Sequence, residues 1–317
     1  QGRNRLWANM QANRFRGVSD FRQEKTTDVD NYLTTSRADG ERFRTERAYI
    51  GTLGWQYAVE DRHLLCVDIQ SGQTKNRRGG DMDYYEDRML PLGLHTIGTY
   101  DSQDRYMLEK ELVQLSASYL WRLNERGDQL SIQSRNRYDW HSLEYTESNM
   151  FDLTGARYEG TRGYEEEHHW DCDEQLDYKW QYRPTGAVEA GYQYVTYSEI
   201  GDYNIKYWDR PAQAFEWQDD LYAPFDYHRQ VHSLFASASD HLGRLDVDAG
   251  LRMDRVRDEM TIAVVGADRD RRRLELYPSA HAAYNTARGT FGIGYARRTN
   301  RPGIWKMEPY ITYEDYY

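Results

Sequence analysis

The sequence has no long hydrophobic run. Only 39% of its 317 residues are hydrophobic. Its charge-free stretches, such as residues 261–267, are far shorter than the roughly 20 apolar residues that a membrane-spanning helix needs. The sequence therefore excludes a helical membrane protein.

Cysteine is also scarce, and basic residues are outnumbered by acidic ones. Cys66 and Cys172 lie far apart with no CxxC or histidine pairing, so free thiols and a single disulfide both stay open. The 52 acidic residues outnumber 41 basic ones, for a net charge of −11, and this disfavours a nucleic-acid partner, which needs a basic stripe. No basic segment followed by an apolar one opens the chain, so we expect either a removed signal peptide or a longer protein.

Aromatic residues, in contrast, are abundant. The chain has 28 Tyr, 9 Trp and 8 Phe but only 7 Pro. Because aromatic side chains bury large areas and disordered chains have few of them, this polar sequence is expected to fold.

The clearest local pattern is an alternation over residues 170–182. Trp170, Leu176 and Trp180 share one face of this segment, and charged or amide side chains occupy the other. A period of two over 13 residues is typical of a β-strand. After the turn at 183–186 the alternation resumes over 187–198, and the two segments predict a hairpin.

The same unit recurs along the chain, and five hairpins are predicted. Their strands and turns are 46–59, turn 61–63, 64–74; 111–123, turn 124–128, 129–141; 170–182, turn 183–186, 187–198; 226–239, turn 240–243, 244–257; and 271–285, turn 286–289, 290–299. Residues 1–40 are expected to add one or two strands, for 10–12 in all.

The predicted connections alternate in length. Turns of a few residues close the hairpins, whereas long polar loops are expected at 75–110, 142–167 and 200–225. Short turns on one rim and long loops on the other are typical of outer-membrane barrels. The prediction is an all-β, antiparallel, up-and-down transmembrane barrel segment over residues 1–317, with one aromatic girdle at Trp121, Trp180 and Tyr182.

The C-terminal part resembles the barrel of TonB-dependent outer-membrane receptors, in particular the Bacteroidetes-type outer-membrane β-barrel family. The resembling residues are Tyr277, Pro278, Ser279, Arg297, Arg298, Asn300, Arg301, Pro302, Trp305, Pro309 and Tyr317. Their order and spacing agree with that family over about 45 residues. The layout of the hairpins before them agrees more loosely, back to about residue 40.

The resemblance implies a receptor that imports a scarce ligand, such as an iron chelate, a glycan or a peptide. In such a receptor a plug domain, which this chain does not include, couples the barrel to the TonB system, and outer-membrane lipid and lipopolysaccharide surround it. The location implied is the bacterial outer membrane. A passive porin-like or structural barrel is the alternative, and an outer-membrane protease or lipase is a third.

Candidate site residues are few. Residues 165–169, Glu-Glu-Glu-His-His, are interpreted as a solvated loop in preference to a cation site, and the basic run 269–273 as a charged strand entry in preference to a lipopolysaccharide contact. Arg297, Arg298 and Arg301 are expected to be structural. Most Tyr and Trp are assigned to the lipid face, and only loop aromatics such as Trp208 and Trp217 are singled out for a test of ligand binding. No catalytic motif, cofactor site or metal site is assigned, and the ligand-binding residues are unknown.

Overall fold

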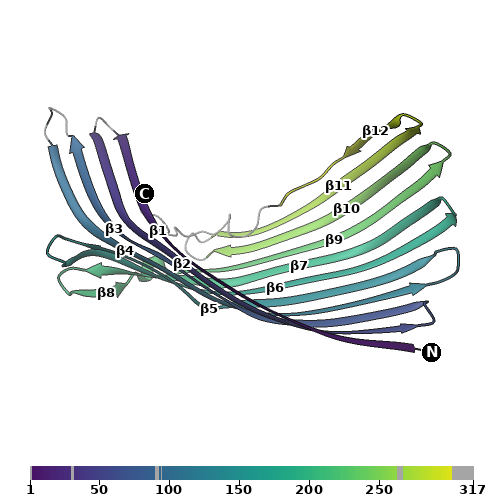
Figure 1. The fold of residues 1–317 in the computed structure, drawn as a ribbon, viewed down its shortest axis with the longest axis horizontal. Coiled ribbons are helices and arrows are strands. Elements are labelled where there is room, and N and C mark those ends of the chain that lie inside the picture. Colours follow the sequence, from purple (N-terminus) through teal and green to yellow (C-terminus); the bar gives the residue numbers. More distant parts are fainter. Residues whose placement is uncertain (1, 30–31, 90–92, 94, 263–266, 302–317) are drawn as a thin grey trace.

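The computed structural model describes residues 2–29, 32–89, 93, 95–262 and 267–301, and these residues form one antiparallel sheet of twelve strands (Figure 1). The strands are β1 (Gly2–Val29), β2 (Tyr32–Val59), β3 (His63–Met89), β4 (His95–Arg122), β5 (Gln129–Phe151), β6 (Arg157–Arg183), β7 (Gly186–Asp209), β8 (Ala214–Trp217), β9 (Ala223–Leu242), β10 (Leu245–Ile262), β11 (Ala267–Thr286) and β12 (Gly289–Ala296). Neighbours in the sheet follow chain order, except that β8 pairs only with β7. The predicted all-β, up-and-down architecture and strand number are confirmed.

One rim of the sheet carries the short turns. The turns after β2, β4, β6, β9 and β11 fall where the alternation predicted them. Local geometry matches the residues there, because Gly243 has a φ of 72° and Gly127 a φ of 104°, in the region that favours glycine. The hairpin registers follow from these turns.

The long loops predicted at 75–110, 142–167 and 200–225 are wrong. Most of these residues continue the strands, so that β2, β3 and β4 reach 27 or 28 residues each. The connections that remain are short, such as residues 152–156 between β5 and β6. Beyond the apolar part of each strand both faces are polar, so the alternation that marks a strand disappears while the backbone hydrogen bonding continues.

The register sorts the side chains into two faces, which we call the apolar face and the polar face. Leu53, Ile69 and Leu115 lie in one cross-strand row, and each is 46–62% exposed. A second row on this same face contains Leu176, Tyr192, Leu234, Met253 and Leu276. The apolar face therefore presents large hydrophobic side chains outwards across the whole sheet.

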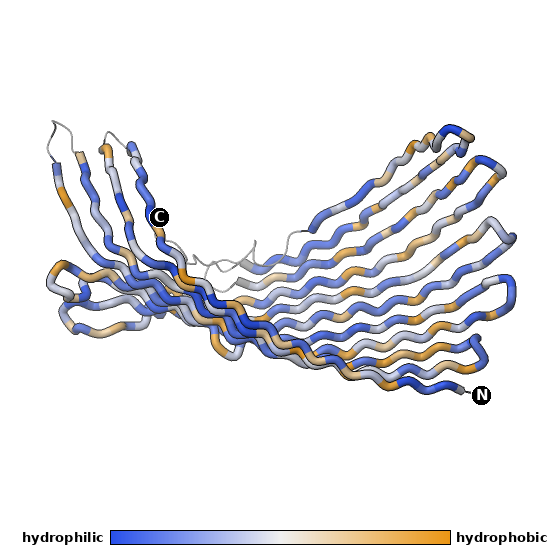
Figure 2. Tube along the Cα trace, in the orientation of Figure 1, coloured by the Kyte–Doolittle hydropathy of each residue, from blue (hydrophilic) through white to orange (hydrophobic). Residues whose placement is uncertain are grey.

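The polar face has the opposite character. The largest fully buried side chains are Ile205, Glu199, Val256, Asp254 and Ser233, and all five lie on this face. Exposed hydrophobic groups and buried polar ones reverse the usual arrangement of a water-soluble protein. Hydrophobic positions are interspersed among hydrophilic ones over parts of the strands in Figure 2, in keeping with this two-faced arrangement. The reversal is typical of a barrel wall with lipid outside and a polar lumen inside.

The apolar face is bounded by two aromatic rows. Trp180 and Trp121 lie beside the short turns, as predicted, and Trp170, Tyr138 and Tyr49 lie farther along the strands. Ten residues separate Trp170 from Trp180, which is roughly 33 Å of strand and about 23 Å of membrane depth at a tilt of about 45°. This depth matches the apolar band of an outer-membrane barrel, about 25 Å tall.

Within the described residues the sheet does not close. Strands β1 and β12 each pair with only one neighbour. Unpaired backbone groups in hydrocarbon cost several kcal/mol each, so these edges need partners in the membrane. This open sheet agrees with the prediction that these strands form part of a larger barrel.

Candidate functional site

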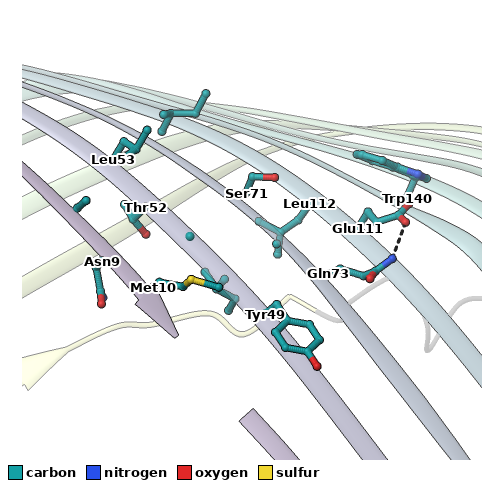
Figure 3. Close-up of a pocket in the computed structure, with 15 residues that line it drawn as sticks. Asn9, Met10, Tyr49, Thr52, Leu53, Ser71, Gln73, Glu111, Leu112 and Trp140 are labelled. Atoms are coloured by element: carbon teal, nitrogen blue, oxygen red, sulfur yellow. Dashed lines mark hydrogen bonds between the residues drawn. The ribbon is translucent and has the colours of Figure 1, made fainter. Parts of the chain in front are cut away.

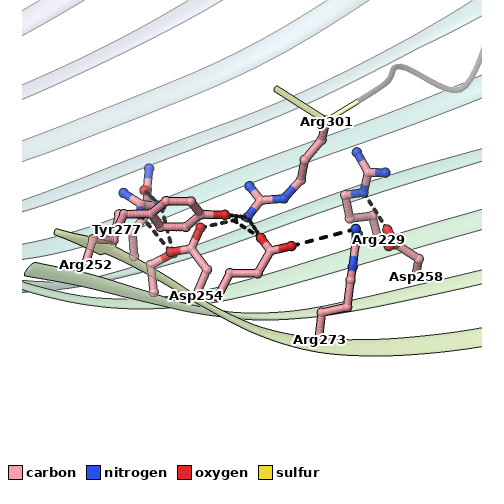
Figure 4. A network of polar contacts seen from close by, with 10 residues as sticks. Arg229, Arg252, Asp254, Asp258, Arg273, Tyr277 and Arg301 are labelled. Atoms are coloured by element: carbon pink, nitrogen blue, oxygen red, sulfur yellow. Dashed lines mark hydrogen bonds and ion pairs between the residues drawn. The ribbon is translucent and has the colours of Figure 1, made fainter. Parts of the chain in front are cut away.

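The polar face of β9, β10 and β11 carries a network centred on Arg301 (Figure 4). Arg301 Nη2 donates hydrogen bonds to Asp254 at 2.9 Å, to Glu275 at 2.7 Å and to the Tyr277 hydroxyl at 3.2 Å. Arg252 also donates to Asp254, at 2.8 Å. Because Asp254 is 2% exposed, the two guanidinium groups compensate a buried carboxylate.

A second ion-paired group lies next to it on the same face. Asp258 accepts hydrogen bonds from Arg229 at 2.6 Å, from Arg273 at 2.5 Å and from the Tyr227 hydroxyl at 3.1 Å. The arginine side chains that belong to these two groups are thus all paired with carboxylates. This part of the wall is cross-linked by charge, which fits the expected structural role of Arg301.

A third group, which we call the His/Glu cluster, joins β5, β6 and β7 and consists of His141, Glu144, Glu167, His169 and Glu199. A β-bulge creates it. The pairing of β5 with β6 shifts between Trp140 and Glu144, so β5 has one residue more than its neighbour there. In a regular strand residues three apart face opposite sides, but the bulge turns His141 and Glu144 to the same side.

The distances within the His/Glu cluster are short. His141 Nδ1 lies 2.7 Å from Glu144 Oε2 and 3.2 Å from Glu167 Oε2. His169 Nε2 lies 3.0 Å from that same Glu167 oxygen, and its Nδ1 lies 3.2 Å from Glu199 Oε2. The five side chains are 1–13% exposed. The cluster is therefore a buried group of three carboxylates and two imidazoles.

The interpretation of residues 165–169 as a solvated loop is wrong. These residues lie inside β6, where Glu167 and His169 face the His/Glu cluster. His168 points to the opposite face and contacts the Tyr138 hydroxyl at 2.7 Å. Sequence spacing alone did not find His141, because the bulge and the β5–β6 register bring it into place.

The basic run 269–273 lies within β11, so its arginines alternate between the two faces. Arg273 pairs with Asp258 on the polar face, whereas Arg272 and Arg257 both pair with Asp270 on the other face. The run does not form a single basic patch. Its interpretation as a charged strand entry fits this arrangement better than a lipopolysaccharide contact does.

Trp208 and Trp217 lie in strands, not in loops as expected. Trp208 is the last residue but one of β7, and its indole Nε1 donates a hydrogen bond of 3.2 Å to the Arg157 carbonyl oxygen. Trp217 ends β8, where Lys206 Nζ lies 4.1 Å from the centroid of its ring. Both indoles are held by cations, at the end of the sheet away from the short turns.

A groove of about 870 Å³ crosses β1 to β5, and most of its lining belongs to the apolar face (Figure 3). Met10, Leu53 and Ile69 line it, and Gln73 Nε2 donates a hydrogen bond of 2.9 Å to Glu111 at its margin. Gly51 lies in its floor, where the missing side chain leaves room. Because the groove faces away from the polar wall, it is separate from the charged networks.

The fold and its two faces define the class of this protein: a membrane-spanning β-sheet whose apolar face meets lipid. Residues 121–317 match the outer membrane protein β-barrel family, and the chain belongs to that family. It is therefore a protein of the bacterial outer membrane, as predicted. No helix among the described residues has the length and hydrophobicity to cross a membrane.

Several solved structures show weak similarity. The ferric citrate transporter FecA in its unliganded form has a TM-score of 0.42 at 10% identity, and the match covers 85% of this chain and 42% of FecA. The copper transporter OprC has a TM-score of 0.27 at 9% identity, with 92% and 61% covered. The outer membrane protease OmpT from Escherichia coli has a TM-score of 0.26 at 12% identity, with 89% and 97% covered. This chain spans less than half the length of FecA, and no curated protein sequence matches it.

Proposed function

We propose that this chain is the barrel portion of a TonB-dependent outer-membrane receptor that captures a scarce ligand and imports it. The supporting observation is a contact between the two halves of the motif that resembles this family. Tyr277 opens the motif and Arg301 belongs to its second half. The Tyr277 hydroxyl and the Arg301 guanidinium are 3.2 Å apart on the polar face. Two of the resembling residues thus lie in contact on one face of the sheet.

The open sheet also favours a receptor. Within the described residues the twelve strands leave β1 and β12 with unpaired edges, and these edges need partners in lipid. Barrels of 16–18 strands leave an aqueous channel, and barrels of about 22 strands are plugged transporters. The proposal therefore includes a plug domain and more strands outside these residues, with the plug as the contact to the TonB system.

The ligand class follows only in outline. Strand extensions and the β7–β8 segment continue beyond the aromatic row at Trp170, Tyr138 and Tyr49. They carry Trp208 and Trp217, which are suited to stacking on sugars or aromatic chelators. An iron chelate, a glycan and a peptide each fit such a surface. Activity as an enzyme is not part of this proposal, because no catalytic motif was found in the sequence.

The test is the complete reading frame followed by a transport assay. The receptor proposal expects a plug-like domain encoded with this barrel and ligand uptake that stops when the TonB system is deleted. The alternative, a passive porin-like barrel, expects steady ion conduction in planar bilayers without energy input. A reading frame without a plug, together with such conduction, would overturn active import.

A further inference from the structure

The His/Glu cluster has the donor set of a metal site. His141, His169 and Glu167 each offer one ligand atom, and these atoms all lie within 4.8 Å of one another. Two imidazoles and a carboxylate suit a first-row divalent transition metal, with Zn²⁺ the common occupant of a His₂Glu set. A tetrahedral centre with bonds of about 2.0–2.1 Å has edges of about 3.3 Å, close to the 3.0 Å and 3.2 Å that separate these atoms from Glu167 Oε2.

His141 points to the same conclusion independently. Its Nδ1 is buried and has no hydrogen-bond partner among the described residues, although carboxylate oxygens of Glu144 and Glu167 lie within 3.2 Å. A cation bound by this ring nitrogen and the Glu167 carboxylate would supply the missing partner. The side chain is only 10% exposed, so water does not supply the missing partner freely.

The surroundings of His169 complete the arrangement. Glu199, which is 1% exposed, lies 3.2 Å from Nδ1 of His169, and the Tyr197 hydroxyl lies 3.1 Å from the same atom. A carboxylate at one ring nitrogen fixes the proton there and turns the lone pair of the other nitrogen towards a metal. The second oxygen of Glu144 is held at 2.9 Å by the Tyr106 hydroxyl.

The nearby positive side chains do not neutralise this cluster. Lys110 and Arg137 both pair with Asp139, the neighbouring carboxylate on β5. Three carboxylates then share only two imidazoles, so a divalent cation balances the charge.

We propose that His141, Glu167 and His169 bind a divalent transition-metal ion, Zn²⁺ in the first place, on the polar face at the level of Trp170. Glu144 lies beside this set, 2.7 Å from His141 Nδ1, and Glu199 is a positioning residue. The ion joins β5 to β6 across the bulge. This inference does not depend on active import, because a passive barrel would carry the same site.

The test uses the intact protein, refolded into detergent free of lipopolysaccharide and stripped of metal with a chelator. Co²⁺ is the probe, because its visible absorption reports coordination by imidazole and carboxylate. The wild-type protein is expected to saturate at one equivalent, and Zn²⁺ to displace the Co²⁺. His169→Ala is expected to abolish the signal, and Glu199→Gln to weaken binding about 10-fold to 100-fold.

His168→Ala is the matched control, because this neighbouring histidine faces the other side of the sheet and is 41% exposed. It is expected to bind Co²⁺ like the wild type. If His169→Ala fails to refold, as judged by heat-modifiable migration on gels, Glu167→Gln takes its place. A wild-type protein that binds no stoichiometric Co²⁺, or an equal loss in His168→Ala, would overturn the proposal.

Discussion

Arg301 and Asp254, which are 47 residues apart in the chain, meet at 2.9 Å on the polar face. Asp254 is almost fully buried, and Glu275 contacts the same guanidinium nitrogen at 2.7 Å. The segment after β12 is thereby tied to β10 and β11. Arg301 was expected to be structural, and these contacts describe how it acts.

Replacing Arg301 with Ala should destabilise the folded sheet. The change leaves the buried Asp254 with only Arg252 as a cationic partner, and breaking a buried ion pair costs about 3 kcal/mol. Urea unfolding in lipid vesicles, followed by tryptophan fluorescence, measures the effect. Arg297→Ala is the control, because Arg297 is exposed and its contact to the Pro278 carbonyl oxygen uses the backbone N–H. Equal unfolding midpoints for the two variants would contradict the role given to Arg301.

The assignment of the two faces is tested at adjacent positions of β6. Leu176 lies on the apolar face and is 43% exposed, whereas Gln175 lies on the polar face and bonds Asp177 at 2.9 Å. Leu176→Arg should destabilise the protein in lipid by roughly 2–4 kcal/mol, because it puts a charge into hydrocarbon. Gln175→Arg should change little, since the lumen is wet. A larger loss of stability for Gln175→Arg than for Leu176→Arg would show that the two faces are assigned the wrong way round.

The turn between β4 and β5 should make stability depend on pH. Hydrogen bonds from Asn124 Nδ2 at 2.7 Å and from the Gln181 backbone N–H at 2.8 Å lower the pKa of the Asp128 carboxyl from its ordinary 3.8. A lowered folded-state pKa stabilises the fold above the unfolded value, and this contribution is lost as the pH falls through the folded value. Asp128→Asn should thus unfold more easily than the wild type at pH 7.

The difference between the wild type and Asp128→Asn should shrink below about pH 4, where the carboxyl begins to take up its proton. Unfolding midpoints at pH 7, 5 and 3 follow this change. Glu125→Gln is the control in the same turn, because Glu125 is exposed. A difference that stays constant over the whole pH range would show that charge at Asp128 is not the cause.

The two cysteines should remain thiols and differ in access. Both are free, and they lie on strands β3 and β6, which are not neighbours. Cys66 lies on the polar face opposite Ser118, whereas Cys172 is buried on the apolar face opposite Asn136. A charged maleimide should label Cys66 faster than Cys172 in the folded protein, because lipid or detergent excludes charge.

Single Cys66→Ser and Cys172→Ser variants identify which thiol reacts, and full unfolding should expose both. Mass spectrometry counts the labels. A protein that takes up no label after unfolding without reductant would carry a disulfide instead.

The sequence predicted the part of the fold that lies in the membrane. Alternation appears only where one face meets lipid and the other meets water, as at Leu176 and Gln175, so hairpin turns and faces could be assigned there. The strand extensions were missed because residues such as 75–89 are polar on both faces. Their strand structure comes from pairing with β2 and β4, which periodicity does not report.

The residues that make up each candidate site could be identified only from the register between the strands. Arg301 was singled out from the motif it belongs to, but its partner Asp254 lies two strands away and only the fold identifies it. The sequence pointed to only part of the His/Glu cluster, namely residues 165–169. His141 was hidden because the bulge in β5 shifts the alternation at that point.

Ser142 is the residue that this bulge adds to β5, and its hydroxyl donates to the Glu109 carbonyl oxygen at 3.2 Å. Loss of a residue from a regular part of the strand would slide every later side chain to the wrong side of the sheet. Loss of Ser142 alone would leave Leu143 and Glu144 opposite their present partners on β4 and β6. The strand thus has one position at which its length can change without exchanging its lipid and water sides, and a homologous chain shorter by one residue could omit this position.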